Sequence, residues 1–291
     1  VFDPLLFLIY INDLPSTITS KICLFADDCV IYHKISNDND IHSLQADLNN
    51  ILHWCHIWKM ELNIQKCKSM RISRSSTTCP TYFLHSHPLE TVTSYRYLGV
   101  HITNTLSWKL YTEHIASKAN KTLGYLRRNF FLAPSSLKLL LYTTYVRPQM
   151  EYASSVWDSG QVTLSHMLES IQNRAARFIL ANYHRSASVT QMKASLNLIP
   201  LVTRRKRTRI CLFHKIFYHN PKLRSRLIQA APFISLRRNH QQKVTVLHCN
   251  TVKYAQSYLP RTCNEWNSLP ASITSINEPI QFKNVLKTMI T

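Results

Sequence analysis

The chain has 291 residues, of which 45% are hydrophobic and 17% charged, a balance typical of a globular protein of one large or two modest domains. Its longest apolar run, Leu5–Ile11, is far shorter than the roughly 20 residues of a membrane span, which excludes a transmembrane segment. The three glycines, Gly99, Gly124 and Gly160, are too sparse for the glycine-rich phosphate loops of P-loop or dinucleotide-binding proteins.

The net positive charge lies entirely in the second part of the chain. Residues 1–110 carry nine lysines and arginines against nine aspartates and glutamates, whereas residues 111–291 carry 26 against six. An excess of this size repels itself unless a polyanion is bound, and nucleic acid is the usual polyanion. A basic surface that only keeps the protein in solution is the alternative.

Eight cysteines occur without any C-x-x-C pair, which indicates reduced thiols of an intracellular protein of the nucleus or cytoplasm rather than a secreted disulfide framework. His53, Cys55, His56 and Cys67 lack the spacing of a tetrahedral zinc site, and ordinary packing explains them better. The first residues show neither an initiator Met nor a signal peptide, so we expect a piece of a longer protein.

In chain order, the first hundred residues predict an α+β region. Asp3 and Pro4 favour a helix start, and the helix is expected to reach Ile11. Two β-type runs follow, joined through a tight turn, and then an amphipathic helix with Asp38 or Asp40 near its start. The expected segments are a hairpin of Ile22–Phe25 and Cys29–Tyr32, a helix from Ile41 to Trp58, a strand from Cys67 to Ser73 and a strand from Tyr95 to Ile102.

Beyond residue 110 the hydrophobic periodicity is helical. The expected helices are Thr112–Arg128, Ser135–Arg147 closed by Pro148, Leu164–Ala181 and Arg204–Tyr218. Arg174 and Arg177 fall off the apolar stripe of the third helix. Near a boundary at Pro200, five basic residues crowd together: Arg204, Arg205, Lys206, Arg207 and Arg209.

The clearest chemical signal is the pair Asp27 and Asp28 between the two runs of the hairpin, which are expected to be buried strands. Carboxylates at the edge of a rigid sheet suit Mg²⁺, which prefers oxygen ligands and accepts phosphate oxygens in its shell. Two solvated turn formers are the alternative, because Asp is a good turn residue.

Several ordered blocks make this chain resemble the reverse transcriptases of non-LTR (LINE-type, jockey-like) retrotransposons. Phe25-Ala26-Asp27-Asp28 resembles their [Y/F]-A-D-D motif. The flanking matches are Pro4-Leu5-Leu6-Phe7 with Tyr10-Ile11-Asn12-Asp13-Leu14, Trp54 and Trp58 with Leu62-Asn63 and Lys66, Tyr97-Leu98-Gly99-Val100, Arg147-Pro148 with Gln172-Asn173-Arg174, and Pro260-Arg261-Thr262 with Trp266-Asn267. Ordered blocks at compatible spacing are far more specific than one tetrapeptide.

The resemblance implies a fold of three parts. Residues 1–108 would form a partial polymerase palm, an antiparallel sheet with helices that holds the FADD hairpin and a primer-grip-like segment. Residues 109–200 would form an all-helical thumb, and residues 201–291 a basic helical C-terminal region. The implied reaction is RNA-templated DNA synthesis from a primer 3′-hydroxyl, with Mg²⁺, deoxynucleoside triphosphates, an RNA template and a DNA primer or target as partners.

It also implies roles for single residues. Asp27 would ligate the catalytic metals, Asp28 would support the site, and Lys66 would assist the leaving group, although a solvent-facing strand lysine is the alternative for Lys66. Tyr97, Leu98 and Gly99 would position the primer end, and a turn that needs positive φ also explains Gly99. The expected nucleic-acid contacts are Arg127, Arg128, Arg174, Arg177, Arg204, Arg205, Lys206, Arg207 and Arg209.

One departure from the family pattern shapes the expected activity. No acid-bearing strand precedes Leu5, where the family supplies its other metal-binding aspartate, and Mg²⁺ needs nearly complete octahedral coordination. We therefore expect a C-terminal fragment that is inactive alone, and the alternative is a non-catalytic nucleic-acid-binding relic. An RNA-templated RNA polymerase is disfavoured, because that class more often has Gly where this chain has Ala26.

Overall fold

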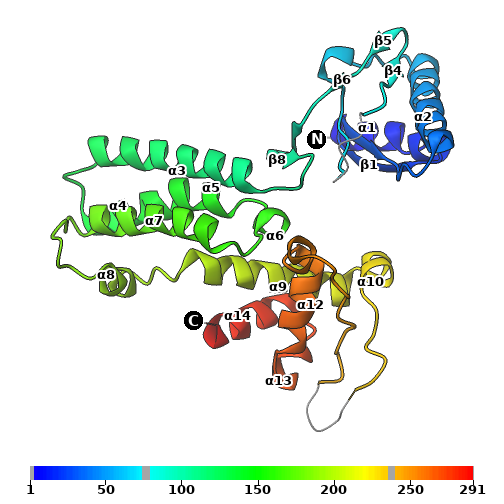
Figure 1. Cartoon of the computed structure of the whole chain (residues 1–291). Helices are drawn as coiled ribbons and strands as arrows, with labels where there is room; N and C mark the ends of the chain where they lie inside the picture. The colour runs from blue at the N-terminus through cyan, green and yellow to red at the C-terminus, as the bar shows by residue number, and fades with distance from the viewer. Residues whose placement is uncertain (1–2, 74–78, 235–239, 291) are drawn as a thin grey trace. The chain divides into compact units, whose positions relative to one another are not determined.

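The computed structural model describes residues 3–73, 79–234 and 240–290, which form two compact units, residues 1–107 and 108–291. Each unit is described by itself below, with the element labels of Figure 1. The expected α+β character is confirmed, since all paired strands of the described residues lie in the first unit and helices dominate the second. None of the helices in these ranges has both the length and the hydrophobicity that a bilayer span requires.

In the described residues the first unit contains the helices or helical turns α1, η1, α2 and η2 and a set of short strands. In order they are α1 (Asp3–Ile11), η1 (Leu14–Thr17), β1 (Lys21–Phe25), β2 (Asp28–Tyr32), α2 (Asp38–Ile57), η2 (Ile64–Lys66), β3 (Lys68–Ser69), β4 (Phe83–Leu84), β5 (His87–Pro88), β6 (Glu90–Thr91), β7 (Ser94–Tyr97) and β8 (Val100–Thr103). Asn37 begins α2 as a capping box: its side chain accepts from the Asp40 amide, and the Asp40 carboxylate accepts from the Asn37 amide.

The strands do not join into one antiparallel sheet. Among the described residues they form four two-stranded pairs: β1–β2, β4–β5 and β7–β8 are antiparallel, and β3–β6 is parallel. The predicted strand Cys67–Ser73 is reduced to two residues, and the predicted strand Tyr95–Ile102 is a hairpin with a turn at Leu98 and Gly99. Such pairs are stable only when one face packs on other elements.

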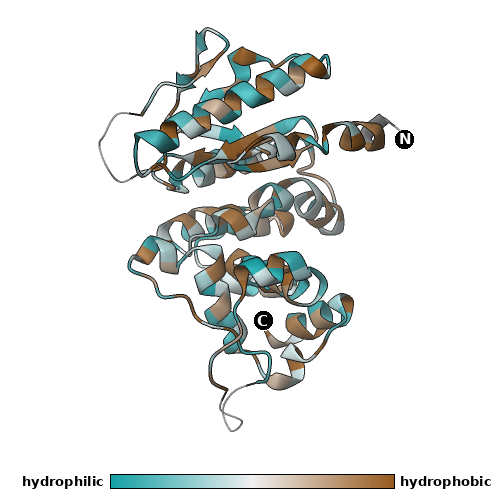
Figure 2. Ribbon diagram, turned by 90° about the vertical axis from the view of Figure 1, so that its right-hand side faces the viewer, coloured by the Kyte–Doolittle hydropathy of each residue, from teal (hydrophilic) through white to brown (hydrophobic). Residues whose placement is uncertain are grey.

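The core of the first unit lies between α1, α2 and the β1–β2 hairpin. Ile11, Ile51 and Trp54 are buried at its centre, and Ile22, Leu24 and Ile31 pack on them from one face of the hairpin. The cluster is small. The outer side of α1 stays open, with Leu5, Leu6, Leu8 and Ile9 more than half exposed, and Figure 2 shows α1 as a largely hydrophobic helix.

The second unit is helical. Its elements are α3 (Lys109–Asn129), α4 (Ser135–Leu141), the π-helical turn η3 (Tyr142–Val146), α5 (Arg147–Glu151), α6 (Ser154–Trp157), α7 (Val162–Ile179), α8 (Val189–Ser195), α9 (Leu201–His219), α10 (Pro221–Leu227), α11 (Val252–Ala255), α12 (Tyr258–Asn267), α13 (Ala271–Thr274) and α14 (Pro279–Met289). The prediction that Pro148 closes a helix is wrong. The π turn inserts before Arg147, so Pro148 falls in the first turn of α5, where no amide hydrogen is needed.

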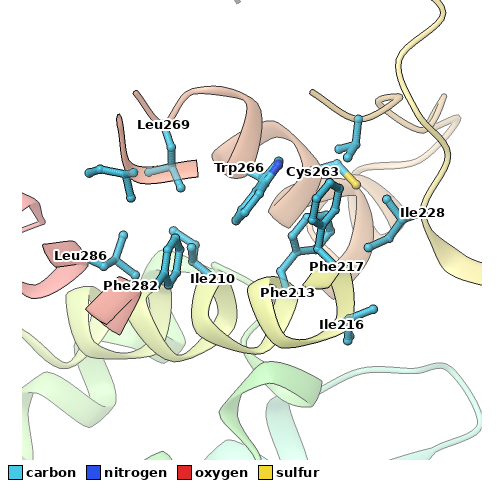
Figure 3. Packing of buried hydrophobic residues seen from close by; sticks show 12 residues of the cluster. Ile210, Phe213, Ile216, Phe217, Ile228, Cys263, Trp266, Leu269, Phe282 and Leu286 are labelled. Carbon is cyan, nitrogen blue, oxygen red and sulfur yellow. The ribbon is translucent and has the colours of Figure 1, made fainter. Parts of the chain in front are cut away.

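Helix α9 is the centre of this unit, with α6 and α7 against it on one side and α12 and α14 on the other (Figure 1). Its apolar face enters a core built around the fully buried Trp266, against which Phe213 and Phe217 of α9 and Phe282 of α14 each pack (Figure 3). The basic stretch 201–209 therefore begins a helix that is packed on several sides, not a free arm.

Candidate functional site

The FADD hairpin, residues 21–32, is held by a buried carboxylate on α2. Asp47, which is 1% exposed, accepts hydrogen bonds from the Thr19 and Ser20 amides at 2.8 and 2.7 Å, and from the Thr19 hydroxyl. Burial alone would raise the pKa of Asp47, but the hydrogen bonds from Ser20 and Thr19 outweigh it and lower the pKa below its usual range. The chain that enters β1 is thereby fixed to α2.

A second tie joins the segment before the hairpin to the end of α2. The Trp54 indole donates to the Asp13 carboxylate at 3.0 Å, and the Tyr10 hydroxyl donates to the Trp58 carbonyl. The rings of Tyr10, Trp54 and Trp58 also stack edge-on or tilted against one another at 4.9–6.0 Å. Two sequence blocks more than 40 residues apart thus pack together and support the hairpin from the same side.

The turn between β1 and β2 contains only Ala26 and Asp27, because Phe25 pairs with Asp28. Ala26 has φ of 50°, a left-handed conformation that is costly for a residue with a Cβ. Positive φ at the first turn residue alone is the pattern of a type II′ turn, whose twist suits a two-residue hairpin. This strained turn presents Asp27 at the tip of the hairpin, with Asp28 as the first residue of β2.

The expectation of buried strands is wrong for one face of this hairpin. Lys21, Cys23 and Phe25 alternate outward, and Phe25 is 62% exposed. Both Asp27 and Asp28 are exposed. The reason is that, within the described residues, the core of this unit packs against Ile22, Leu24 and Ile31 on one face of the hairpin and against no side chain of the other face.

The primer-grip-like hairpin, residues 94–103, lies within electrostatic reach of the FADD hairpin. Burial, followed by the charges of Cys23 and Asp28, raises the pKa of Tyr97. Leu98 and Gly99 form the turn between Tyr97 and Val100 with φ of 46° and 80°, as in a type I′ turn. The explanation of Gly99 as a positive-φ turn residue is therefore confirmed.

No described hydrogen bond or ion pair holds Lys66 near Asp27 and Asp28. It ends the 3₁₀ turn η2, not a strand, and its amide donates to the Asn63 side chain at 3.2 Å. Its side chain is exposed, and within the described parts of the chain no hydrogen bond or ion pair joins it to Asp27 or Asp28.

The two carboxylates do not amount to a complete two-metal centre. Nowhere in the described residues do three or more His, Cys, Asp or Glu side chains gather in a way that could hold a metal ion. Mg²⁺ demands near-octahedral oxygen coordination, and two exposed carboxylates supply only part of it.

The predicted basic contacts divide into two classes. Arg205 and Arg209 are 2% and 1% exposed, and both pair with the buried carboxylate of Asp158, at 3.2 and 2.8 Å. Arg209 also binds Glu265, and Arg205 lies over the Trp157 ring. A phosphate has no access to either guanidinium, so the prediction that these two arginines contact nucleic acid is wrong in this fold.

Two further arginines of α9 are also engaged inside the unit. Arg204 forms a two-pronged ion pair with Glu151, and Arg207 donates to the carbonyls of Lys287 and Ile290 at the end of α14. Lys206 is partly exposed and has no ion pair in the described structure. The acids that pair with Arg204, Arg205 and Arg209 come from α5, from the residue that follows α6 and from α12, so no local pattern in the sequence predicts the pairing.

Arg127, Arg128, Arg174 and Arg177 lie on α3 and α7, the first three exposed and Arg177 partly so. The C-terminal turns of these helices border an open pocket, the α3–α7 pocket, in which Arg127 lies 5.7 Å from the Tyr183 ring centre and Phe131 is exposed. Its lining residues are Gly124, Arg127, Arg128, Phe131, Lys138, Phe178, Ala181 and Tyr183. Surfaces that bind nucleic-acid strands typically combine cationic side chains with exposed aromatic rings.

Comparison with known proteins agrees with the sequence blocks. The family described as reverse transcriptase (RNA-dependent DNA polymerase) matches residues 2–102. The probable RNA-directed DNA polymerase from transposon X-element of Drosophila melanogaster is 24% identical over 193 residues, 62% of this chain and 21% of that protein. The RNA-directed DNA polymerase from mobile element jockey of the same species is 22% identical over 181 residues, 57% of this chain and 19% of that protein.

A third relative extends the match toward the C-terminus. The probable RNA-directed DNA polymerase from transposon BS of Drosophila melanogaster is 24% identical over 257 residues, which cover 82% of this chain and 28% of that protein. The chain thus spans between 19% and 28% of the length of these curated relatives. No solved structure matches the chain significantly. Residues 2–102 thus match the reverse transcriptase family, and the chain is similar to the RNA-directed DNA polymerases of the X-element and jockey mobile elements.

Proposed function

We propose that this chain acts as part of an RNA-directed DNA polymerase, with Asp27 and Asp28 in its metal centre. The observation that carries the proposal is the exposed acid pair of one hairpin: a strained two-residue turn presents Asp27, Asp28 follows it as the first residue of β2, and the charge of Asp28 contributes, after burial and Cys23, to the raised pKa of Tyr97 in the second hairpin of the same unit. In this assignment residues 1–108 serve as a partial palm, residues 109–200 as a thumb and residues 201–291 as a basic C-terminal region.

The proposed substrates are deoxynucleoside triphosphates, an RNA template and a DNA primer or target. Mg²⁺ bound at the two aspartates would supply charge stabilisation at the phosphates. Because the described residues offer no third ligand, the complete centre requires a carboxylate from outside them, and Tyr97, Leu98 and Gly99 would position the primer end beside it. Lys66 keeps its proposed role at the leaving group only if substrate binding brings it closer, since it has no contact with the two acids in this structure.

We place the thumb's grip on nucleic acid at the α3–α7 pocket. Arg127 and Arg128 are exposed there, and neither has a carboxylate partner in the described residues. Arg174 and Arg177 extend the surface along α7, although Arg174 bonds to Ser170 on its own helix and Arg177 donates to the His184 carbonyl at 3.0 Å. Contacts of this kind reach phosphates and carry no sequence information.

Primer extension tests the catalytic part of the proposal. We expect no incorporation by the 291-residue chain alone with an RNA template and Mg²⁺, because its metal centre is incomplete. In a chimaera in which residues 1–108 replace the matching segment of a jockey-type polymerase, Asp27→Asn should abolish synthesis and Asp28→Asn should reduce it less. Asp38→Asn, an exposed acid at the start of α2, is the matched control and should leave the rate unchanged.

A second function, nucleic-acid binding without catalysis, is favoured by one observation: no third metal ligand joins Asp27 and Asp28 in the described residues. The same chimaera separates the two functions. If the chimaera with the unaltered hairpin is as inactive as Asp27→Asn while it still binds primer–template, the non-catalytic function is the better account.

A further inference from the structure

A groove between α9 and α14 carries a concentration of positive charge that no step above uses. Five of its lining residues are basic, namely Arg204, Arg207, Lys215, Lys283 and Lys287, and no aspartate or glutamate lines it within the described structure. Its floor is formed by the apolar side chains between these cations, with Cys211 among them. We call this feature the α9–α14 groove.

The groove is preformed because both of its walls are anchored. Arg207 donates from Nε to the Ile290 carbonyl and from a terminal nitrogen to the Lys287 carbonyl, each at 2.8 Å, and so ties the end of α14 to α9. Phe282 and Leu286 of α14 are fully buried against Ile210 and other residues of the unit's core, as Figure 3 shows. A ligand would therefore meet fixed helices and would not need to order them.

Three of the five cations are available to a ligand. Arg204 is neutralised by Glu151, and Arg207 is occupied by the two carbonyls. Lys215, Lys283 and Lys287 are exposed, and in the described parts of the chain they have no ion pair or hydrogen bond from their ammonium groups. Lys283 and Lys287 lie four residues apart, so their Cα atoms are about 6 Å apart along the axis of α14.

The pKa of the Cys211 thiol is influenced by the cations that line the groove. Burial raises the pKa of Cys211, whereas the charges of Lys283, Lys215, Lys287 and Arg207 act to lower it. One sulfur atom thus feels four positive groups from two helices. The rings among the groove's described lining residues, those of His214 and Phe282, are both buried, so neither offers an exposed face on which a base could stack.

We propose that the α9–α14 groove binds phosphodiester phosphates of a nucleic-acid strand, with Lys215, Lys283 and Lys287 as the contacts. This inference rests on the proposed function, because it extends the grip on nucleic acid from the α3–α7 pocket to a second place on the same unit. Binding through phosphates alone predicts strong salt dependence and no sequence preference.

Residue-resolved alkylation of the full chain tests the groove directly. A 20-nucleotide single-stranded RNA should slow the alkylation of Cys211 at least threefold, as read by mass spectrometry, while Cys249, outside the groove in the same unit, should react at an unchanged rate. The double substitution Lys283→Gln and Lys287→Gln should abolish the protection. The matched control, Lys222→Gln with Lys253→Gln, removes the same charge from exposed lysines outside the groove and should keep it.

Anisotropy titrations of the same RNA give an independent measure. Loss of two phosphate contacts should reduce the slope of log K against log salt by about 1.4, since each contact on a single strand contributes about 0.7. Exposed lysine substitutions on a helix surface change stability little, so the variants should fold as the parent does, which circular dichroism checks.

The outcomes distinguish failure of the groove from failure of the proposed function. If the RNA binds but Cys211 reacts at the same rate as in the free protein, the groove is overturned and the proposed function stands. If tripolyphosphate protects Cys211 and the RNA does not, the groove takes a small phosphate compound and the nucleic-acid assignment is wrong. If the RNA does not bind at low salt, both the groove and the nucleic-acid surface of the proposed function are rejected.

Discussion

The two units of this chain use charge and hydrophobic burial in opposite ways. The first, residues 1–107, has balanced charge, a thin core on one side of a hairpin, and an open apolar helix α1. The second, residues 108–291, carries the whole net positive charge on a continuous core around Trp266. The first unit presents acids at a turn and an apolar helix face, whereas the second packs around a buried aromatic core and presents cations.

This comparison shows that net charge overstates the charge available to a ligand. Four of the five basic residues at 204–209 are bound inside the second unit, two of them to the single carboxylate of Asp158. In the first unit, apolar side chains that would ordinarily be buried are exposed on α1. Contiguous exposed apolar surface of this kind marks a site of contact with other protein surface. Stability is therefore expected to reside in the second unit, and the following predictions test that division.

The largest effect is expected at the buried ion network of the second unit. Asp158→Asn removes the charge that faces Arg205, Arg209 and Arg261, and leaves Arg205 without another carboxylate. A broken buried pair costs about 3–5 kcal/mol of unfolding free energy, which urea denaturation measures. Glu151→Gln removes the partly exposed partner of Arg204 and should cost about 1 kcal/mol or less of unfolding free energy. An equal loss in both variants would contradict a larger contribution of the buried ion pairs at Asp158.

In the first unit the corresponding anchor is Asp47, and its effect depends on pH. Because the folded-state pKa of Asp47 lies below the value of about 3.9 in the unfolded chain, its contribution is complete above about pH 5 and is lost as the pH falls through the folded-state pKa. Asp47→Asn should cost about 2 kcal/mol at pH 7.

Hydrogen exchange of the Thr19–Phe25 amides follows this anchor. In the parent chain their protection should fall on acidification below pH 4, and in Asp47→Asn it should be low already at pH 7 and change little with pH. A variant that retains the acid-dependent loss would show that another group anchors the hairpin.

The arginines of the second unit should separate by role. Arg127→Gln with Arg128→Gln should leave stability unchanged and reduce the slope of log K against log salt on duplex by about 1.8, since each phosphate contact contributes about 0.9. Arg205→Gln should instead lower stability and leave the slope unchanged where the protein remains folded, because its guanidinium is buried. Filter binding at four salt concentrations distinguishes the exposed arginines from the buried one. Identical slopes of log K against log salt in all variants would show that the α3–α7 pocket does not contact nucleic acid.

The smallest effect concerns glycine. Gly99→Ala forces a Cβ into a turn position with φ of 80° and should destabilise the primer-grip-like hairpin by about 1 kcal/mol. Gly124→Ala on α3 should stabilise the second unit by up to about 1 kcal/mol, because an added Cβ meets only the Arg128 side chain, at 3.5 Å. Thermal denaturation followed unit by unit should show opposite signs; the same sign in both would contradict the turn geometry.

Much of this fold follows from local pattern. The hydrophobic period predicts α2, α3, α7 and α9 to within a few residues, and alternation with two turn residues predicts the FADD hairpin. The single strand expected over 95–102 fails because Leu98 shares the positive φ of Gly99, which turns the chain back on itself. Pro148 fails as a stop because a π turn shifts the register of the helix before it.

The site is harder to predict than the elements. Asp27 and Asp28 are found from sequence because both acids and their strands are contiguous. The pairing of Arg209 with Glu265 spans 56 residues, and that of Arg204 with Glu151 spans 53. No short-range pattern indicates that a charge is buried by so distant a partner. From the sequence, the basic stretch at 204–209 therefore predicts a phosphate-binding surface, whereas in the structure most of these side chains hold the second unit together. The α9–α14 groove is missed for the same reason, since its lysines come from helices about 70 residues apart.

The central claim is that the first unit carries the catalytic hairpin while the second grips the nucleic acid. A hydrogen-exchange footprint of the whole chain with a primer–template duplex tests it most directly. We expect protection concentrated in residues 108–291, at the ends of α3 and α7 and along α9 and α14, which fades between 50 and 300 mM salt. Protection confined to residues 1–107, or protection that salt does not weaken, would contradict the account.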